Sequence, residues 1–389
     1  MEVRVIDSAE QFLAIATDWN ELLETADAAS IFMTWEWNHH WWQHYGKHHS
    51  LCIVTVWDDD RLKAILPIYL QQTRVLRIWP TTTARFIGTG GDTSPDYLGP
   101  ILDPASANLT IPVLVTFVIH QLPNWSILCL SDLDQSSDFY AELDRQFRAC
   151  GYFHTSELSA TIALAALPRT WDDYLASLNG DRRNTIRRTR RKIETQHQGR
   201  FYVVTEENQV DDVLGSLIEL HHKRWQGNPE GHSFSTPEYI AFHRDVVHAI
   251  ARHDRIRLYC LEADGKRIAV LYCYRFRNQI FYFQAGFDPD YERLRPGLVL
   301  IGYSLEHAIG EGNDVYDFLR GDHGYKTQWG KSRRETHAFT AFRPGAQTTL
   351  HLLQTKGISR LKGHLKRIFP ALARNRNAHG SNAGKQHGA

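Results

Sequence analysis

Five side chains with acid–base chemistry lie within ten residues near the end of the sequence. They are Asp317, Asp322, His323, Tyr325 and Lys326, in the run DFLRGDHGYKTQWG. Histidine titrates near neutral pH, so His323 could act as a general base. Asp317 could orient a substrate amine, or act as the base if its pKa is raised. An ion pair between Asp317 and Lys326 and a water-facing position for His323 are the structural alternatives, so only the whole cluster indicates a catalytic site.

A second group of residues could bind an anion. The segment ERLRPGL places Pro296 at the expected first position of a helix, where its missing N–H is not needed. Backbone N–H groups and the dipole at that helix end attract phosphate, and Gly297 and Leu298 would lie against it. Arg293 and Arg295 could add charge-assisted hydrogen bonds. The alternative is a solvated basic turn that caps a core helix.

Two further segments are candidates for contact with a substrate. Residues 182–192, RRNTIRRTRRK, carry seven basic side chains in eleven positions and are expected to be helical. A solvated or salt-bridged face, an anionic ligand and an RNA backbone are the three interpretations. The glycine-rich segment 88–99 lacks the lysine of a P-loop. We interpret it as a loop lining a cleft, in which Asp92, Asp96 and Tyr97 could meet a polar acceptor.

Metal and disulfide chemistry are not indicated. No histidine pair among the 21 histidines combines His-x-x-x-His spacing with the carboxylate that zinc sites favour, so we expect no metal. The five cysteines are odd in number, far apart and without a CxxC pair, which predicts reduced thiols.

The elements that position these residues recur in two copies. Stretches 51–70 and 257–276 each show the pattern of a strand, an acidic turn and a second strand. A strand and two helices precede each hairpin, and a strand, a helix and a strand follow it. The expected ranges are 3–7, 9–25, 33–45, 84–88, 111–121 and 126–130 in the first copy, and 201–205, 210–225, 237–253, 279–286, 297–309 and 315–319 in the second. Strand 268–274 is apolar on both faces, which predicts an α/β fold with helices on both sides of the sheet. Two unrelated α+β domains are the alternative.

Length and composition limit the class of protein. The chain has 389 residues, 42% of them hydrophobic, with 44 basic and 44 acidic side chains. These values are typical of a folded protein of two or three domains, and the zero net charge disfavours DNA binding. No apolar run reaches the roughly 20 residues of a membrane span, and the first residues do not resemble a signal peptide. We therefore expect a cytoplasmic protein.

The composition changes after residue 345. From His351 onward there are eight basic and no acidic residues. Segment 356–369 predicts a basic amphipathic helix that docks on the preceding domain or lies on an anionic membrane surface. We divide the chain into domains 1–165 and 166–345 and a tail, 346–389.

Two segments resemble a known family. The run AGFDPDYERLRPGLVLIGYSLEHAIGEGNDVYDFLRGDHGYKTQWG is similar to the C-terminal half of the CelD/BioF2-like tandem acyltransferases, and FMTWEWNHHWW to their N-terminal half. These proteins belong to the GCN5-related N-acetyltransferase (GNAT) superfamily and are similar in layout to Fem-type aminoacyltransferases. The resemblance covers residues 3–343 and implies two tandem GNAT-like three-layer α/β/α domains.

The resemblance also implies an activity. An acetyl-CoA or other acyl-CoA donor would bind at Arg293, Arg295, Gly297 and Leu298, although only one glycine of the superfamily's Q/R-x-x-G-x-G/A sequence is kept. Tyr325 would protonate the departing thiolate. A small-molecule or glycan-precursor acceptor would occupy a cleft completed by the first domain, whose own donor site we expect to be empty. Transfer from an aminoacyl-tRNA is disfavoured because sustained a/d heptads are missing. A scaffold that has lost catalysis is the non-enzyme alternative.

Overall fold

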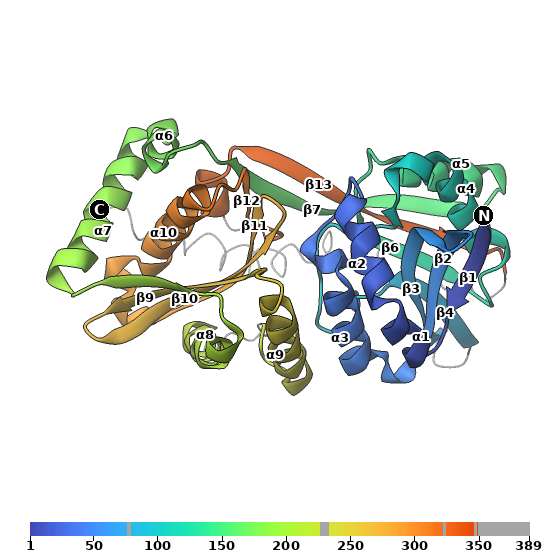
Figure 1. Ribbon diagram of the computed structural model, residues 1–389, viewed down its shortest axis with the longest axis horizontal. Helices are drawn as coiled ribbons and strands as arrows, with labels where there is room; N and C mark the ends of the chain where they lie inside the picture. Colours follow the sequence, from blue (N-terminus) through green and yellow to red (C-terminus); the bar gives the residue numbers. More distant parts are fainter. Residues whose placement is uncertain (76–78, 226–232, 322–323, 346–347, 349–389) are drawn as a thin grey trace, which may run out of the picture.

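The fold repeats one plan twice. The computed structural model describes residues 1–75, 79–225, 233–321, 324–345 and 348 (Figure 1). The strands of the first half are β1 (Glu2–Ile6), β2 (Ser50–Asp58), β3 (Arg61–Val75), β4 (Trp79–Phe86), β5 (Ile101–Leu102), β6 (Ile127–Leu133) and β7 (Phe153–Ala166). Its helices are α1 (Ala9–Ala14), α2 (Ala16–Thr25), α3 (Trp35–Tyr45), α4 (Ala107–His120) and α5 (Asp138–Ala149).

The second half opens with two additional helices and then repeats the plan. Its helices are α6 (Trp171–Ser177), α7 (Gly180–Gln196), α8 (Val210–Trp225), α9 (Pro237–Ala251) and α10 (Pro296–Gly310). Its strands are β8 (Arg200–Val204), β9 (Ile256–Ala263), β10 (Lys266–Phe276), β11 (Gln279–Phe287), β12 (Val315–Asp317) and β13 (Ser332–Phe342). Each range expected from the repeat overlaps one of these elements, with differences in their bounds. Ile15 interrupts the helix expected over 9–25. The strand expected over 84–88 is β4, which begins at Trp79 and ends at Phe86, and the strand expected over 315–319 ends at Asp317.

Local sequence explains where several helices begin. A side-chain oxygen at the N-cap position accepts a hydrogen bond from an N–H of the first turn, which satisfies a donor that would otherwise lack a partner. The residues that cap in this way are Ser8, Thr34, Ser137, Thr170, Asn179 and Thr236.

All the strands join one mixed sheet. The order is β1-β2-β3-β4-β6-β13-β7-β12-β11-β10-β9-β8, with β5 beside β3. Among the described strands, parallel pairing occurs at two equivalent places, β4 with β6 and β11 with β12. Each parallel pair is short, since three residue pairs align before the strands separate. The repeat therefore places two similar strand gaps in the molecule.

The last strand of each half crosses into the other half. β7 pairs with β12 of the second half, and β13 pairs with β6 of the first, both antiparallel. The exchanged strands also pair with each other along their length, from Phe153 opposite Phe342 to Leu164 opposite Ser332. The sheet is consequently continuous through the middle of the molecule (Figure 1). The repeat did not predict β7, β13 or α5, and the division at residue 165 stays a prediction.

Helices cover both faces of the second half. α6, α7 and α10 lie on one face, and α8 and α9 lie on the other (Figure 1). Side chains of β10 alternate between the two: Leu271 and Cys273 join the core under α10, whereas Tyr272 and Tyr274 join the core on the α8 and α9 side. The expected three-layer arrangement is confirmed.

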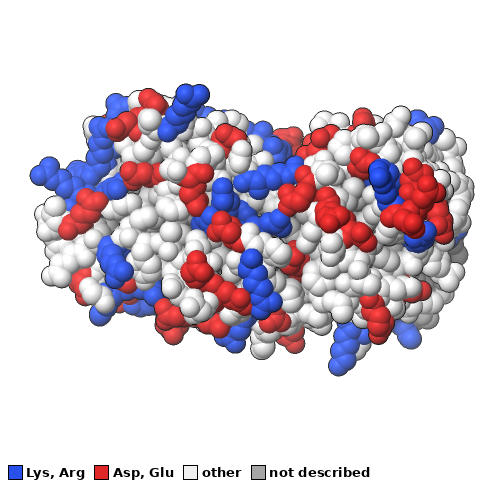
Figure 2. Space-filling view, viewed as in Figure 1, with Lys and Arg blue, Asp and Glu red and all other residues white. Residues whose placement is uncertain are grey.

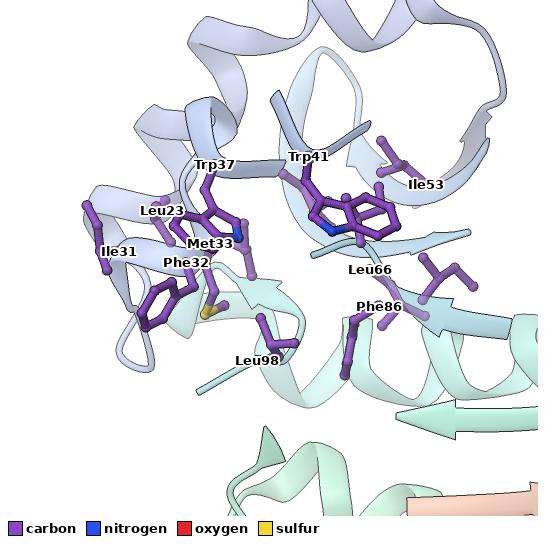
Figure 3. Packing of buried hydrophobic residues seen from close by; sticks show 14 of the residues in the cluster. Leu23, Ile31, Phe32, Met33, Trp37, Trp41, Ile53, Leu66, Phe86 and Leu98 are labelled. Atoms are coloured by element: carbon purple, nitrogen blue, oxygen red, sulfur yellow. The ribbon is translucent and has the colours of Figure 1, made fainter. Parts of the chain in front are cut away.

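The core on the α8 and α9 side continues into the first half. Phe32 and Trp37 pack edge to face with ring centroids 4.8 Å apart (Figure 3). Both rings also contact Tyr274 of β10, at 6.1 and 6.0 Å between centroids. The tryptophan-rich segment of the N-terminal half therefore forms buried core between the halves.

Polar contacts also join the halves. The Arg277 guanidinium donates hydrogen bonds to the carbonyl oxygens of Leu23, Glu24 and Ala26 at 2.8, 3.1 and 2.7 Å, at the C-terminal end of α2. Because carbonyls at a helix C-terminus carry partial negative charge, a cation there stabilises the helix. His44 of α3 also pairs with Asp245 of α9 at 2.7 Å.

No helix within the described ranges is long and apolar enough to cross a membrane. The amphipathic helix expected over 356–369 lies outside the described residues.

Candidate functional site

The candidate site surrounds the point where β11 and β12 separate. The two strands run parallel from Gln279 opposite Val315 to Phe281 opposite Asp317. Beyond this pair β12 ends, and β11 carries a bulge, because Tyr272 and Cys273 of β10 face Gln284 and Tyr282. Phe283 is the extra residue of this bulge. Bulges redirect side chains beside functional sites.

The two faces of the sheet carry different groups at this gap. Adjacent residues of paired parallel strands point to the same face, so Phe281 and Asp317 share one face. Tyr282 and Phe318 belong to the core on the opposite face, under α10. The gap therefore lies between a carboxylate on one side and a tyrosine on the other.

Asp317 is a buried carboxylate with two hydrogen-bond donors. It is 0% exposed. The Tyr97 hydroxyl donates to Oδ2 at 2.7 Å, and the Leu319 N–H donates to Oδ1 at 2.7 Å. Burial raises the pKa of Asp317 to about 7, against the lowering effect of these two donors. A carboxyl with this pKa can take up a proton near neutral pH.

Lys326 organises the loop after β12. Its ammonium group donates to the carbonyl oxygens of Phe318, Leu319 and Arg320 at 2.8, 3.2 and 2.6 Å, and the residue is 6% exposed. Burial lowers the pKa of Lys326 to about 8. All three ammonium protons have acceptors. The geometry indicates that Lys326 positions the loop after β12. Within the described residues, Lys326 forms no ion pair with Asp317.

Tyr325 lies beside the strand gap, directly before the 3-10 turn Lys326–Gln328. Its hydroxyl is 3.1 Å from the Tyr282 hydroxyl. Burial raises the pKa of both phenols, whereas the nearby Arg224 guanidinium lowers them. Arg224 also lies over the Phe287 ring at 4.4 Å. A protonated phenol beside a cation can donate a proton to an anionic leaving group.

The expected anion site has the backbone of a helix start. Pro296 is the first residue of α10, and Arg295 before it adopts φ 47° and ψ 53°, a left-handed conformation that is uncommon outside glycine. The N–H groups of Gly297 and Leu298 fall in the first turn, where a helix offers them no carbonyl. Arg293 and Arg295 are exposed and lie at this helix end.

Arg182 of α7 adds positive charge to this end of α10. Its guanidinium lies over the Trp329 ring at 4.6 Å and donates to Gln328 at 2.6 Å. Burial lowers the pKa of Arg182, and the positive charge of Arg295 acts in the same direction. Helix α7 packs against the turn Pro289–Leu294 and against α10. An open groove of about 540 Å³ begins at Arg182. Residues 177–182 line one side of it, and residues 327–331 line the other.

The basic helix predicted over 182–192 is α7, and its cations have different surroundings. Arg190 pairs with Glu194 and Glu306. Arg187 and Arg188 are exposed. Figure 2 shows Lys and Arg side chains gathered over the end of the molecule that α7 forms. The helix therefore combines a salt-bridged part with a part directed to the α10 N-terminus.

The glycine-rich loop contributes residues to the centre of the molecule. Asp92 accepts a hydrogen bond from Tyr45 at 2.6 Å and another from Thr236, the N-cap of α9. Asp96, which is 2% exposed, accepts from the Arg320 backbone N–H at 2.9 Å and from its Nε at 2.8 Å. These carboxylates hold the halves together in the structure, and their predicted contact with an acceptor stays a prediction.

Arg320 was not among the predicted site residues. It binds Asp96 and also Asp132 of β6, so one guanidinium joins the loop after β12 to two carboxylates of the first half. The arginine is part of the run that suggested the site, but its partners are about 190 to 220 residues away in sequence. Sequence spacing does not indicate such a contact.

Asp322 and His323 lie outside the described residues. Their predicted roles stay predictions. Within the described ranges, no group of three or more His, Cys, Asp or Glu side chains is arranged to hold a metal ion.

Comparison with known proteins defines the class of this domain. Residues 180–327, from the start of α7 to the 3-10 turn that follows Tyr325, match the family described as "Acetyltransferase (GNAT) domain". The chain thus carries a GNAT domain and is an acyltransferase. No curated protein matches the sequence.

The whole chain has a Fem-like layout. It superposes on FemX with a TM-score of 0.60 at 10% identity, covering 91% of this chain and 99% of that one. It is also similar to L-PGS from Bacillus licheniformis, with a TM-score of 0.51 at 13% identity, covering 91% and 98%. The C-terminal domain (DUF2156) of a proposed lysylphosphatidylglycerol synthetase from Agrobacterium fabrum gives a TM-score of 0.51 at 15% identity, covering 90% and 97%. These likenesses show a shared fold, and the predicted relation to the GNAT superfamily with a Fem-like layout is confirmed.

Proposed function

We propose that this chain transfers an acyl group from an acyl-CoA to an amine or hydroxyl of a sugar or envelope-polysaccharide precursor. The observation that carries the proposal is the placement of three groups around one strand gap: Asp317 on one face, Tyr325 on the other, and the α10 N-terminus with its arginines at the end. Acyl transfer needs a proton acceptor, a proton donor and a place for the donor's phosphates.

The residues at the α10 N-terminus fit an acyl-CoA. Two arginines without an ion-pair partner among the described residues, Arg293 and Arg295, lie at this helix end with two first-turn N–H groups. Arg182 is on α7, which packs against α10 and the turn before it. Helix N–H groups and guanidinium groups are the usual ligands of a pyrophosphate. The bound donor would supply a thioester carbonyl, and it is consumed as a substrate.

The chemistry divides between the two faces. Asp317 takes one proton from the acceptor nucleophile, whose lone pair forms a bond to the acyl carbon. The carbon–sulfur bond breaks, and the departing thiolate takes the phenol proton of Tyr325. The products are the acylated acceptor and the CoA thiol, and the proton held by Asp317 returns to solvent as Tyr325 is reprotonated. Tyr282 orients the Tyr325 hydroxyl through their 3.1 Å contact.

Transfer from an aminoacyl-tRNA is the second candidate, and the observation that favours it is the FemX-like layout. It would use the same strand gap, with α7 as the basic surface for RNA. Among the described helices α7 is the longest, at 17 residues, and it packs on α10. A projecting helical arm is therefore not part of the described residues.

Titration calorimetry with acetyl-CoA tests the proposal. We expect one site, and we expect the double variant Arg182→Ala/Arg295→Ala to bind at least about tenfold more weakly, because two charge-assisted contacts to phosphate are lost. Arg188→Ala is the matched control, since Arg188 is exposed on α7 six residues from Arg182 and points to another side of the helix.

Other results would reject the acyl-CoA donor or establish the second candidate. An absence of heat and of thermal stabilisation with acetyl-CoA, hexanoyl-CoA and palmitoyl-CoA would reject an acyl-CoA donor. Tight binding of aminoacyl-tRNA by the same protein would then establish the second candidate.

A further inference from the structure

A pocket lies between the two halves on the Asp317 face of the sheet. Its volume is about 510 Å³, a size usual for small-molecule sites. The first half supplies the segment 26–30, the loop 97–100 and the start of α5, and the second half supplies β11 and β13. Neither half forms this pocket alone.

The pocket adjoins the buried carboxylate through two of its lining residues. Phe281 lines the pocket and is the direct neighbour of Asp317 in the parallel pair. Tyr97 also lines it, and its hydroxyl donates to Asp317 at 2.7 Å. Asp317 itself is 0% exposed, so its contact with a molecule in the pocket would pass through the Tyr97 hydroxyl.

The charge of the pocket favours a cation. Four carboxylates line it: Asp27, Asp134, Asp138 and Glu335. No Lys, Arg or His of the described residues forms an ion pair with any of these four, although Ser136 donates to Asp134. Among the described residues that line the pocket, Arg334 is the one basic side chain, and it lies over the Tyr97 ring at 5.1 Å. Unpaired carboxylates around a partly enclosed space produce a negative potential that attracts an ammonium group.

Much of the remaining lining is apolar and would contact a carbon skeleton; it includes Met33, Leu98, Ile111 and Phe139. Ser30, Ser137, Gln279 and Thr336 add uncharged polar groups. A few polar groups placed in an apolar wall are the usual composition of a site for a small organic molecule.

We propose that this pocket binds the acyl acceptor, and that the acceptor is a small molecule bearing a primary amine that is positively charged when free. The proposal deepens the function proposed above and rests on it. The carboxylates hold the ammonium form at the entrance, and the Tyr97 hydroxyl receives the amine at the strand gap. One ammonium proton passes by way of Tyr97 to Asp317, which leaves the amine nitrogen a free lone pair. That nitrogen forms the new bond to the acyl carbon of the donor thioester as the carbon–sulfur bond breaks, and the departing thiolate takes the phenol proton of Tyr325. The second proton that the nitrogen loses restores the Tyr325 phenol, and the proton held by Asp317 is released to solvent.

Binding of matched pairs of molecules to the full chain tests the proposal without any donor. D-glucosamine is compared with D-glucose, and cadaverine with 1,5-pentanediol, by calorimetry at low salt. We expect the amine of at least one pair to bind at least tenfold more tightly than its neutral partner. We also expect the preference to fall as salt is raised, because the attraction is electrostatic.

Charge-neutral variants locate the site. Asp27→Asn/Glu335→Gln keeps the shape of both side chains and should reduce amine binding at least tenfold. Glu21→Gln, an exposed carboxylate on α2 outside the pocket, is the control and should bind as the natural chain does. Because all three positions are exposed, circular dichroism should show an unchanged fold.

The outcomes separate this proposal from the proposed function. Equal binding of amine and neutral partner in both pairs, or full amine binding by Asp27→Asn/Glu335→Gln, would overturn the pocket proposal even if acetyl-CoA binds. Amine binding that depends on the pocket carboxylates, together with no binding of any acyl-CoA, would sustain the pocket and reject the acyl-CoA transferase.

Discussion

The Tyr97 hydroxyl, in the first half of the chain, donates a hydrogen bond of 2.7 Å to the carboxylate of Asp317, which lies 220 residues later. Tyr97 adopts a left-handed backbone conformation, with φ 58°, in the loop that reaches across to the second half. A bulky side chain rarely takes this conformation without support from its surroundings. The proposed proton acceptor is therefore completed by a residue of the other half.

Replacing Tyr97 with phenylalanine should change the titration of Asp317. The Tyr97 hydroxyl is the first of the two donors that lower the pKa of that carboxyl against the effect of burial. The Tyr97→Phe variant should therefore show the rising limb of its pH–rate profile at higher pH than the natural chain, with kcat reduced about tenfold or more. Tyr45→Phe, which removes the hydroxyl that binds Asp92 in the same loop, should leave the limb in place. An identical limb in both variants would argue against a hydrogen bond that tunes Asp317.

The natural chain should gain activity as pH rises through about 7. The pKa of Asp317 is raised to about 7, so its carboxyl is protonated below that pH and becomes a base above it. Tyr97, the Leu319 N–H, Asp96 and Arg334 are the groups whose charges or hydrogen bonds act on it besides burial. Asp317→Asn should lower kcat about 100-fold or more, the contribution usual for a general base, and the limb should vanish. Measurement of kcat/KM from pH 5 to 9 checks both expectations.

The same titration affects stability. A carboxyl whose pKa is raised on folding binds its proton more tightly in the folded chain. The free energy of unfolding should therefore decrease as pH rises from about 4 to about 7, and Asp317→Asn should show a smaller decrease in urea titrations at the two pH values.

Loss of the Tyr325 hydroxyl should affect the chemical step rather than binding. Tyr325→Phe retains the ring and removes the proton donor, so kcat should fall about 10- to 100-fold while the dissociation constant of acetyl-CoA changes less than twofold. Tyr291→Phe, which alters a tyrosine of the turn before α10, is a suitable control. An unaltered kcat in Tyr325→Phe would exclude it as the proton donor.

Removing the Arg277 side chain should destabilise the contact between the halves. Arg277→Ala leaves three carbonyl oxygens at the end of α2 without their shared donor. We expect a loss of about 1 kcal/mol in the free energy of unfolding, since water can reach this position. Arg145→Ala, which breaks an exposed pair within α5, should leave the unfolding midpoint unchanged. Equal midpoints for the two variants would show that Arg277 does not stabilise the interface.

Much of the fold follows from patterns close in sequence. The hairpins around Asp59 and Asp264 have acidic turns and apolar strands, and the ranges predicted from them agree with β2, β3, β9 and β10. The start of α10 at Pro296 also follows from local chemistry, because proline suits the first helical position.

The exchanged strands could not be predicted in the same way. β7 includes exposed residues such as Phe153 and Leu158, and β13 begins with four exposed residues, so neither shows the alternation of a half-buried strand. Their stability comes from pairing with each other and with the opposite half. The sequence repeat therefore predicts the elements that each half forms by itself, and it does not predict the strands that the halves exchange.

Part of the site was predicted because its residues are close together in sequence. Asp317, Tyr325 and Lys326 are close in sequence, and the structure brings all three to the strand gap. Tyr282 and Arg320 were missed because their partners come from distant segments. Tyr97 was predicted as a loop residue near an acceptor, but its bond to Asp317 depends on how the halves meet.

The crossing of β7 and β13 bears on how such a chain could have arisen. If the linker at residues 167–170 were absent, each copy would leave its own sheet incomplete and would carry a strand that fits its neighbour. Two separate copies of one ancestral unit would then associate as a dimer with swapped final strands, because the pairing satisfies both edges at once. Gene duplication followed by fusion would convert that dimer into one polypeptide, and the two gaps would be free to diverge. The second copy would keep the donor site at its gap, whereas the first copy would lose its donor site and supply Tyr97.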